Sequence, residues 1–330
     1  MSWRRQYEAP PRLPQPYLIT PISLKITMTP FLQIVARHLY AEIKNNSEGL
    51  TIIFPNKRAG LFFNNYLRQE LDNYVWAPKY VTIDEVWRQL STKQVADPIE
   101  LVCRLYRVYL KQTGRQESLD HFYSWGETMC RDFDDIDNSM AHAEKLLGNV
   151  QELEDLKDFE FLSENQREAL RLYFDHYMVK SDTELKQKFS AIWHHLYPIY
   201  QQFREALAEE GLAYMGMLKR EVVNTLEACG AGEVPSYFQG RRFVVVGFNV
   251  LSPTEQRLFL AMKRMAPTSF YWDYDRGYTN LGEGNDNHSV YEAGQFIKEN
   301  IRLFGNALDA LTEEEQAEAY DNFSDRKSVV

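Results

Sequence analysis

The chain has 330 residues, of which 44% are hydrophobic, 14% aromatic and 25% charged, so it can bury a sizeable core and is not a disordered chain. Its net charge of −10 argues against a small, dedicated nucleic-acid-binding domain, which is usually basic, and confines any such site to a local basic patch. Three widely spaced cysteines, Cys103, Cys130 and Cys229, argue against a disulfide framework and fit a reducing cytoplasm. The sequence has no apolar run of about 18 residues, the length that would predict a transmembrane helix. We therefore expect a cytoplasmic protein with no membrane contact.

The first 27 residues are rich in proline and precede the first helical pattern, which begins after Met28. They lack the continuous apolar segment and the small-residue cleavage site of a signal peptide. We interpret residues 1–27 as a flexible N-terminal extension upstream of a natural start at Met28. A genuine N-terminal arm is the alternative.

Helix and strand patterns alternate over residues 28–85, which predicts the first part of an α/β domain. The expected elements are a helix at 30–44, a strand at 50–55, a turn at 56–60, a helix at 60–72 and a strand at 80–83. Thr82 and Glu85 have the spacing of a capping box that opens the next helix. The order strand, turn, helix, strand favours a parallel sheet.

Residues 86–235 show almost only helical periodicity and are predicted to form a helical insertion domain, punctuated by Pro98, Gly114, Gly148, Pro198 and Gly211. The second part of the α/β domain is expected at 236–305. Its predicted elements are strands at 241–248 and 268–273, a helix from Ser252-Pro253 to about residue 264, a loop at 275–289 and a helix at 290–304. Residues 306–330 are predicted to be a solvated acidic tail. Ser328-Val-Val330 resembles the start of an interrupted strand, which predicts a truncated chain.

Neither glycine-rich phosphate-binding pattern, G-x-x-x-x-G-K-[ST] or G-x-G-x-x-G, is present. The turn from Pro55 to Gly60 comes nearest, but it lacks the glycines that let backbone N–H groups surround a triphosphate. Gly247, Phe248 and Asn249 follow a buried strand, where a nucleotide hydrolase places acidic residues for Mg²⁺. We interpret them as a degenerate nucleotide motif and expect no cofactor.

The remaining candidates for catalysis or metal binding are weak. Asp132 and Asp135 lie three residues apart on a predicted helix and could hold a cation; the alternative is a helix end with Phe133 and Ile136 in the core. No histidine pair has zinc-ligand spacing and no G-x-S-x-G elbow is present. We therefore predict no catalytic residue and no metal ligand, and no complete active site is recognisable.

Asn56, Lys57 and Arg58 form a different kind of candidate site. They directly follow a predicted buried strand, at the edge of a parallel sheet where α/β proteins bind ligands. Two cations and an amide beside a helix N-terminus suit a phosphodiester chain. An ordinary polar turn that caps a helix is the alternative.

Several segments, in this order, resemble AddB-type helicase–nuclease subunits, with the PD-(D/E)XK nuclease family proteins of Bacteroides-like bacteria as the nearest match. The segments are Thr51-Ile-Ile-Phe-Pro-Asn-Lys-Arg-Ala-Gly60, which resembles helicase motif Ia, Tyr80-Val-Thr-Ile-Asp-Glu-Val-Trp87, the stretch from Phe122 to Asp137, Gly211-Leu-Ala-Tyr-Met-Gly216 with Arg220, and the stretch from Phe243 to Gln256, which resembles a decayed motif II.

This resemblance implies an inactivated RecA-like core (P-loop NTPase-like) with a helical insertion, in a protein of double-strand-break repair. The implied partners are single-stranded or end DNA, a partner helicase–nuclease subunit, and a C-terminal nuclease domain that is missing here. Asn56, Lys57 and Arg58 would contact the DNA backbone, and Trp87 would stack on a base or lie in the core. Two other hypotheses remain: a protein-interaction module that docks a helicase without DNA contact, and a nucleotide hydrolase with an unusual loop.

Overall fold

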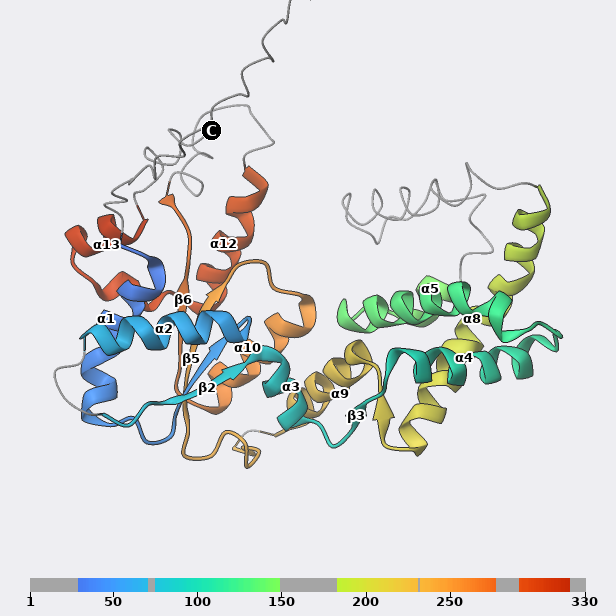
Figure 1. Ribbon diagram of the computed structural model, residues 1–330, viewed down its shortest axis with the longest axis horizontal. Helices are drawn as coiled ribbons and strands as arrows, with labels where there is room; N and C mark the ends of the chain where they lie inside the picture. The colour runs from blue at the N-terminus through green and yellow to red at the C-terminus, as the bar shows by residue number, and fades with distance from the viewer. Residues whose placement is uncertain (1–28, 71–74, 149–182, 231, 277–290, 321–330) are drawn as a thin grey trace, which may run out of the picture.

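The computed structural model describes residues 29–70, 75–148, 183–230, 232–276 and 291–320. Figure 1 shows two halves side by side: a sheet flanked by helices on the left, and a group of helices on the right. Helices α3 (Ile83–Leu90) and α9 (Met215–Ala228) lie between the two halves. One hydrophobic cluster contains residues of both halves, for example Val245 in the sheet and Leu105 in the helical half.

The sheet has four parallel strands in the order β2-β1-β5-β6. They are β1 (Leu50–Phe54), β2 (Lys79–Thr82), β5 (Arg242–Phe248) and β6 (Thr268–Trp272). Every residue of β1 is buried, because a parallel sheet with both faces covered needs apolar side chains on each side. Ile52 and Phe54 point to one hydrophobic cluster and Ile53 to the other, as the two-residue period of a strand requires.

Helices cover both faces of this sheet. On one face, α1 (Phe31–Asn45) packs against α2 (Lys57–Glu70), and their cluster also contains residues of η3 (Ala307–Ala310) and α13 (Glu313–Tyr320). On the other face, α10 (Pro253–Met265) packs against α9 and against α12 (Tyr291–Phe304). The predicted α/β class with a parallel sheet is therefore confirmed.

The predicted helix starts agree with the local chemistry. Thr82 and Glu85 form the predicted capping box: the Thr82 hydroxyl accepts from the Glu85 backbone N–H, and the Glu85 carboxylate accepts from the Thr82 backbone N–H. Ser252 and Glu255 form a second one at the start of α10, which runs to Met265 as predicted. Both boxes satisfy N–H groups that the first helical turn leaves unpaired.

Three predictions need correction. Helix α2 begins at Lys57, so the expected turn at 56–60 is largely the first turn of a helix. Helix α8 (Thr183–Glu209) continues through Pro198 instead of ending there. Residues 306–320 are not a solvated tail, because they form η3 and α13 and bury Leu308 and Tyr320 against α1 and the sheet. The predicted loop at 275–289 and the chain end at 328–330 lie largely or wholly outside the described residues.

The helical half lies between β2 and β5 in the sequence. Its further described elements are a two-stranded parallel sheet of β3 (Gln94–Val95) and β4 (Leu212–Ala213), together with α4 (Pro98–Thr113), α5 (Leu119–Asn138) and α6 (Ala143–Gly148). Helix α5 packs against α4 and α9, and α8 packs against α4 and α6. Phe122 and Phe133 on α5 are fully buried, as their helical spacing predicts.

A buried carboxylate joins α5, α8 and α9. Asp137 is 0% exposed. One oxygen accepts hydrogen bonds from the Tyr200 hydroxyl at 2.6 Å and from Arg220 Nη1 at 2.8 Å, and the other accepts from Arg204 and from the Tyr214 hydroxyl. Burial raises the pKa of Tyr200 to about 12 and that of Tyr214 well above its usual value, so both phenols stay protonated and donate.

This network gives a structural reason for two of the sequence patterns. Tyr214 and Arg220 belong to the segment that begins at Gly211, and both bond to the last residue of the segment from Phe122 to Asp137. Between them, Gly216 donates its backbone N–H to Asp134 Oδ1 at 2.6 Å. A Cβ at Gly216 would lie 2.2 Å from the Asp134 carbonyl oxygen, so only glycine allows α9 to approach α5 this closely.

We expect Asp137→Asn to lower the free energy of unfolding by about 3–5 kcal/mol, because it leaves two partly buried arginines without their counter-ion. Chemical denaturation monitored by circular dichroism measures this change. Asp135→Asn is the matched control: it is the same substitution at an exposed position of the same helix, and we expect a change within about 0.5 kcal/mol. Equal effects in the two variants would contradict the structural role of Asp137.

A second prediction concerns His38 on α1, whose Nδ1 lies 2.8 Å from the Tyr271 hydroxyl on β6. Burial lowers the pKa of His38 below its usual value, against the opposite effect of Glu315 and Glu42. The unfolded chain then binds the proton more readily, so stability is lost as the pH falls through about 6.5. Between about pH 7.5 and 5.5, the free energy of unfolding should fall less in His38→Gln than in the unaltered chain.

His121→Gln, which removes an exposed imidazole from α5, is the matched control for this measurement. An identical pH dependence of the His38→Gln and unaltered proteins would show that the environment of His38 does not oppose its protonation.

Candidate functional site

The candidate site lies at the carboxyl end of the sheet, between β1 and β5. The connection β1–α2–β2 runs toward one edge of the sheet, whereas β5–α10–β6 runs toward the other. The loops after β1 and β5 therefore diverge, and such a switch point is where open α/β sheets bind ligands. The two strands pair directly, with Ile53 opposite Val245, so the residues that follow them are neighbours.

The residues after β1 are Asn56, Lys57 and Arg58, all of them exposed. The Asn56 side chain accepts a hydrogen bond from the Ala59 backbone N–H at 3.0 Å, which caps the start of α2. Lys57 and Arg58 occupy the first turn of this helix. Gly60 lies one turn further, where a Cβ would meet the Phe54 ring at 3.4 Å, so α2 packs closely on β1.

The charge in this first helical turn opposes the helix dipole. Helices α3 and α10 also begin at the carboxyl end of the sheet. Their first turns carry acidic residues, which the positive end of the helix dipole favours. The first turn of α2 has none and carries two cations instead. Such an arrangement costs about 0.3–1 kcal/mol per charge, so it does not serve the stability of the helix.

The two cations differ in their surroundings. Lys57 Nζ lies 3.6 Å from a carboxylate oxygen of Glu85, although 81% of the lysine side chain is exposed. The pKa of Glu85 is lowered mainly by the hydrogen bond from the Thr82 backbone, with a smaller contribution from Lys57. Within the described part of the chain, Arg58 forms no ion pair, so its guanidinium is available to an anion.

The residues after β5 offer a different surface. Gly247 has φ +75° at an irregularity in the pairing of β5 with β6, and Phe248 is buried against Phe259. Asn249 is exposed, and its backbone carbonyl accepts a hydrogen bond from Asn300 at 2.6 Å. These three residues, predicted as a degenerate nucleotide motif, place no carboxylate next to Lys57 and Arg58.

The described residues form no recognisable metal centre. Among the described residues, no group of three or more histidine, cysteine, aspartate or glutamate side chains is placed to hold a metal ion. Asp132 and Asp135 belong to α5, and the carboxylates of this helix that bond to α9 are those of Asp134 and Asp137. Burial raises the pKa of Asp134, against the hydrogen bond from Gly216.

Of the two alternatives for Trp87, the structure agrees with the core, because a buried ring cannot stack on a base. Its side chain is 0% exposed in the cluster between α3 and α9, with Lys219 Nζ 5.9 Å from the ring centroid. An exposed aromatic residue that the sequence analysis did not single out is Phe62, which is 50% exposed on α2 next to Leu61, exposed by 67%. The run Leu61-Phe62-Phe63 could have indicated this exposure from the sequence. Three consecutive residues cannot all face the core from one helix, and only Phe63 of the three is buried.

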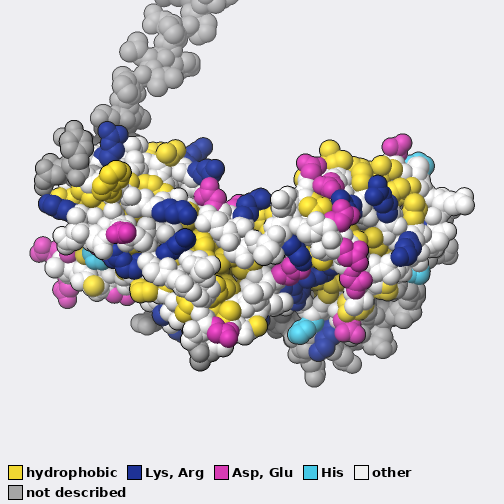
Figure 2. All heavy atoms as spheres, turned by 90° about the horizontal axis from the view of Figure 1, so that it is seen from below, with side chains coloured by type: hydrophobic (Ala, Val, Ile, Leu, Met, Phe, Trp, Pro, Cys, Tyr) yellow, Lys and Arg dark blue, Asp and Glu magenta, His cyan; other side chains and the backbone are white. Residues whose placement is uncertain are grey.

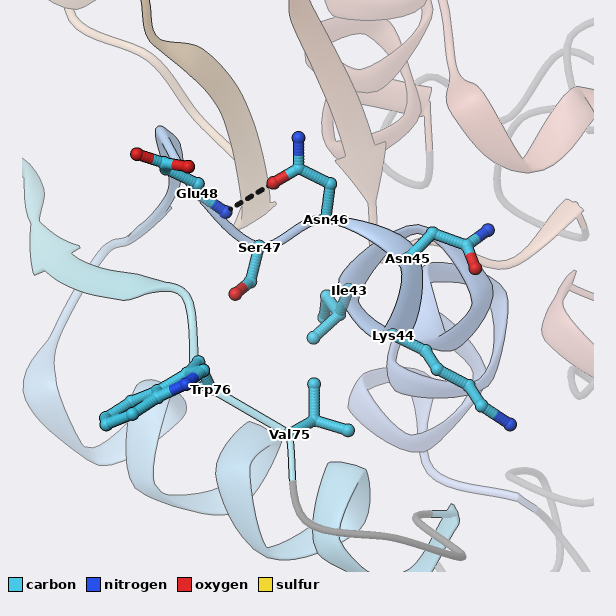
Figure 3. A pocket seen from close by; sticks show the side chains of 8 residues that line it. All are labelled: Ile43, Lys44, Asn45, Asn46, Ser47, Glu48, Val75 and Trp76. Carbon is cyan, nitrogen blue, oxygen red and sulfur yellow. Dashed lines mark hydrogen bonds between the residues drawn. The ribbon is translucent and has the colours of Figure 1, made fainter.

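A separate pocket lies at the opposite end of the sheet (Figure 3). It has a volume of about 460 Å³, and the loop between α1 and β1 lines one side of it, while Val75 and Trp76 line the other. Trp76 is 88% exposed. None of the predicted site residues lies in this pocket.

In comparisons with known proteins, no protein family and no curated protein matches this chain. In the parts of the chain that the structure describes, no helix is both long enough and apolar enough to span a membrane.

Gly247 gives a prediction about this site. A Cβ there would meet open space, with the Phe31 ring 4.0 Å away as its nearest neighbour, so the cost of Gly247→Ala is backbone strain alone. We expect a loss of about 1–2 kcal/mol in the free energy of unfolding, measured by chemical denaturation. Gly60→Ala is the matched control, because Gly60 lies in a helix where alanine is favourable and its nearest neighbour leaves ordinary contact distance. A Gly247→Ala protein as stable as the Gly60→Ala protein would contradict the left-handed conformation.

Proposed function

We propose that this chain is a non-catalytic, helicase-like scaffold that binds DNA at the carboxyl end of its sheet. The observation that carries the proposal is the exposed pair Lys57 and Arg58 in the first turn of α2, at the switch point between β1 and β5. The helix N-terminus and the two cations together attract phosphate groups. The proteins that the sequence resembles are DNA-repair helicase–nuclease subunits.

The sheet supports a RecA-like core as the finer description of the fold. Its strands are parallel, helices cover both faces, and a large helical segment interrupts the chain between β2 and β5. An insertion at this point is what the resemblance implies. We therefore assign β1 and the start of α2 to the motif Ia-like segment, and the end of β5 to the decayed motif II.

The residues after β5 favour a scaffold over a nucleotide hydrolase. Hydrolysis with Mg²⁺ needs a carboxylate that holds the ion through its water shell. Gly247 has no side chain, Phe248 is buried, and Asn249 carries an amide. The turn before Gly60 likewise lacks the glycines of a phosphate loop.

The side of the molecule at which the strands begin carries charges of both signs. Figure 2 views the molecule from the side at which the strands begin, and most acidic side chains on this face lie over the helical half. Lysine and arginine side chains lie over the α/β half, beside hydrophobic patches. Lys57 and Arg58 lie at the other end of the sheet, so the charges on this face neither favour nor oppose DNA at the proposed site.

A protein-interaction module is the second candidate. The exposed Leu61 and Phe62 on α2 favour it, because apolar side chains of this size are common at protein interfaces. Docking of a partner helicase through this face would not require Lys57 and Arg58. Charge reversal at the two cations would then leave assembly unchanged.

Titration of a fluorescently labelled single-stranded oligonucleotide with this chain, followed by anisotropy at several salt concentrations, tests the DNA proposal. We expect Lys57→Ala/Arg58→Ala to weaken binding and to reduce the slope of log K against log salt by roughly 1.4, because two phosphate contacts are lost. Arg107→Ala/Lys111→Ala on α4 is the matched control, since it removes two exposed cations of the helical half and changes the net charge equally.

Equal binding by the unaltered chain and the Lys57/Arg58 variant would place the DNA elsewhere. No binding at low salt by a folded protein would reject the DNA scaffold and leave the interaction module as the better account.

A further inference from the structure

The solvent-facing side of α2 combines cations with an exposed aromatic ring. Its exposed residues recur mostly at spacings of three and four: Lys57, Arg58, Leu61, Phe62, Asn65, Arg68 and Gln69. The opposite side carries Gly60, Phe63 and Leu67, which are buried against α1 and the sheet. The helix therefore already has a complete core-facing stripe, and Leu61 and Phe62 are not needed for packing.

The charges on α2 indicate what covers this face. Lys57, Arg58 and Arg68 are cations, and Glu70, the acidic residue of the helix, forms an ion pair with Arg37 of α1 at 3.3 Å. Arg58 and Arg68 lie about 15 Å apart along the helix axis, and Phe62 lies between them, one turn from Arg58. An apolar ring between cations matches a ligand with anionic groups at intervals and flat apolar faces between them.

We propose that Phe62 is a base-stacking residue for single-stranded nucleic acid, whose backbone follows the exposed face of α2 from Arg58 toward Arg68. Stacking on an aromatic ring is the common way to hold unpaired bases without regard to sequence, and cations beside the ring hold the phosphates. This inference rests on the proposed DNA-binding function. It assigns to Phe62 the role that the buried Trp87 cannot perform.

If Phe62 stacks on unpaired bases, its contribution to binding should disappear when the bases are removed from the oligonucleotide. Two oligonucleotides that differ only in the presence of bases test this. We compare a labelled oligothymidine with an abasic oligonucleotide of the same length and backbone, each titrated with the full chain by anisotropy. Phe62→Ala should weaken binding of the oligothymidine by roughly 5- to 150-fold and leave binding of the abasic oligonucleotide unchanged. Phe62→Leu, which keeps apolar bulk without the ring, should recover only part of the loss.

Phe296→Ala is the matched control, because Phe296 on α12 is 49% exposed and lies on the other face of the sheet. It should alter neither affinity, and circular dichroism checks that both alanine variants remain folded. An unchanged affinity of Phe62→Ala for oligothymidine, or an equal loss with both probes, overturns the stacking role. This result would favour a protein partner on the face of α2.

The two proposals fail in different ways. If the unaltered chain binds neither oligonucleotide, both the DNA-binding function and the stacking role are wrong. If both probes bind and Lys57→Ala/Arg58→Ala weakens them equally, while Phe62→Ala has no effect, the backbone site stands and the stacking role is rejected.

Discussion

The buried carboxylate of Asp137 is the constraint on which the helical half depends. An ion removed from water costs several kcal/mol unless charges and hydrogen bonds replace its hydration. Here they come from Tyr200 and Arg204 on α8, from Tyr214 just before α9, and from Arg220 on α9. Asp137 can therefore be buried only when α5, α8 and α9 have come together in one arrangement.

This constraint extends toward the sheet through α9. Arg220 also donates to the Ala141 carbonyl at 2.6 Å, which fixes the chain just after α5. At the end of α5, the Asn138 side chain accepts a hydrogen bond from Thr254 on α10 at 2.8 Å. Helix α10 lies on the sheet and connects β5 to β6. The packing of the helical half is thus coupled to the strands that border the candidate site.

The candidate site lies at the carboxyl end of a well-packed sheet, and the cations in the first turn of α2 do not stabilise that helix. Capping boxes complete the first turns of α3 and α10, whereas α2 begins with two cations against its own dipole. Its exposed face also carries Leu61 and Phe62, which the core does not use. The proposed ligand, a polyanion with unpaired bases, accounts for both the charges and the exposed ring.

The sequence by itself determined the local structure. Apolar β-branched runs and helical spacing predicted β1, β5, β6 and the main helices within a few residues, because backbone preferences and burial patterns act over short distances. The pair Thr82 and Glu85 identified a helix start for the same reason. The sequence also singled out Lys57 and Arg58 after a buried strand, although it placed them in a turn rather than in the first turn of α2.

Only the tertiary structure decided which side chains are accessible and which distant residues meet. Trp87 and Phe62 both lie on helices that follow strands. Helix α9 covers Trp87, whereas Phe62 is half exposed and no described residue covers its ring. Residues 306–320 read as an acidic tail, yet Leu308 and Tyr320 complete the core on α1. The pairing of β1 with β5, separated by almost two hundred residues, places Ile53 opposite Val245 and so brings the segments after the two strands to the same end of the sheet. Such contacts depend on packing between elements, which no local pattern encodes.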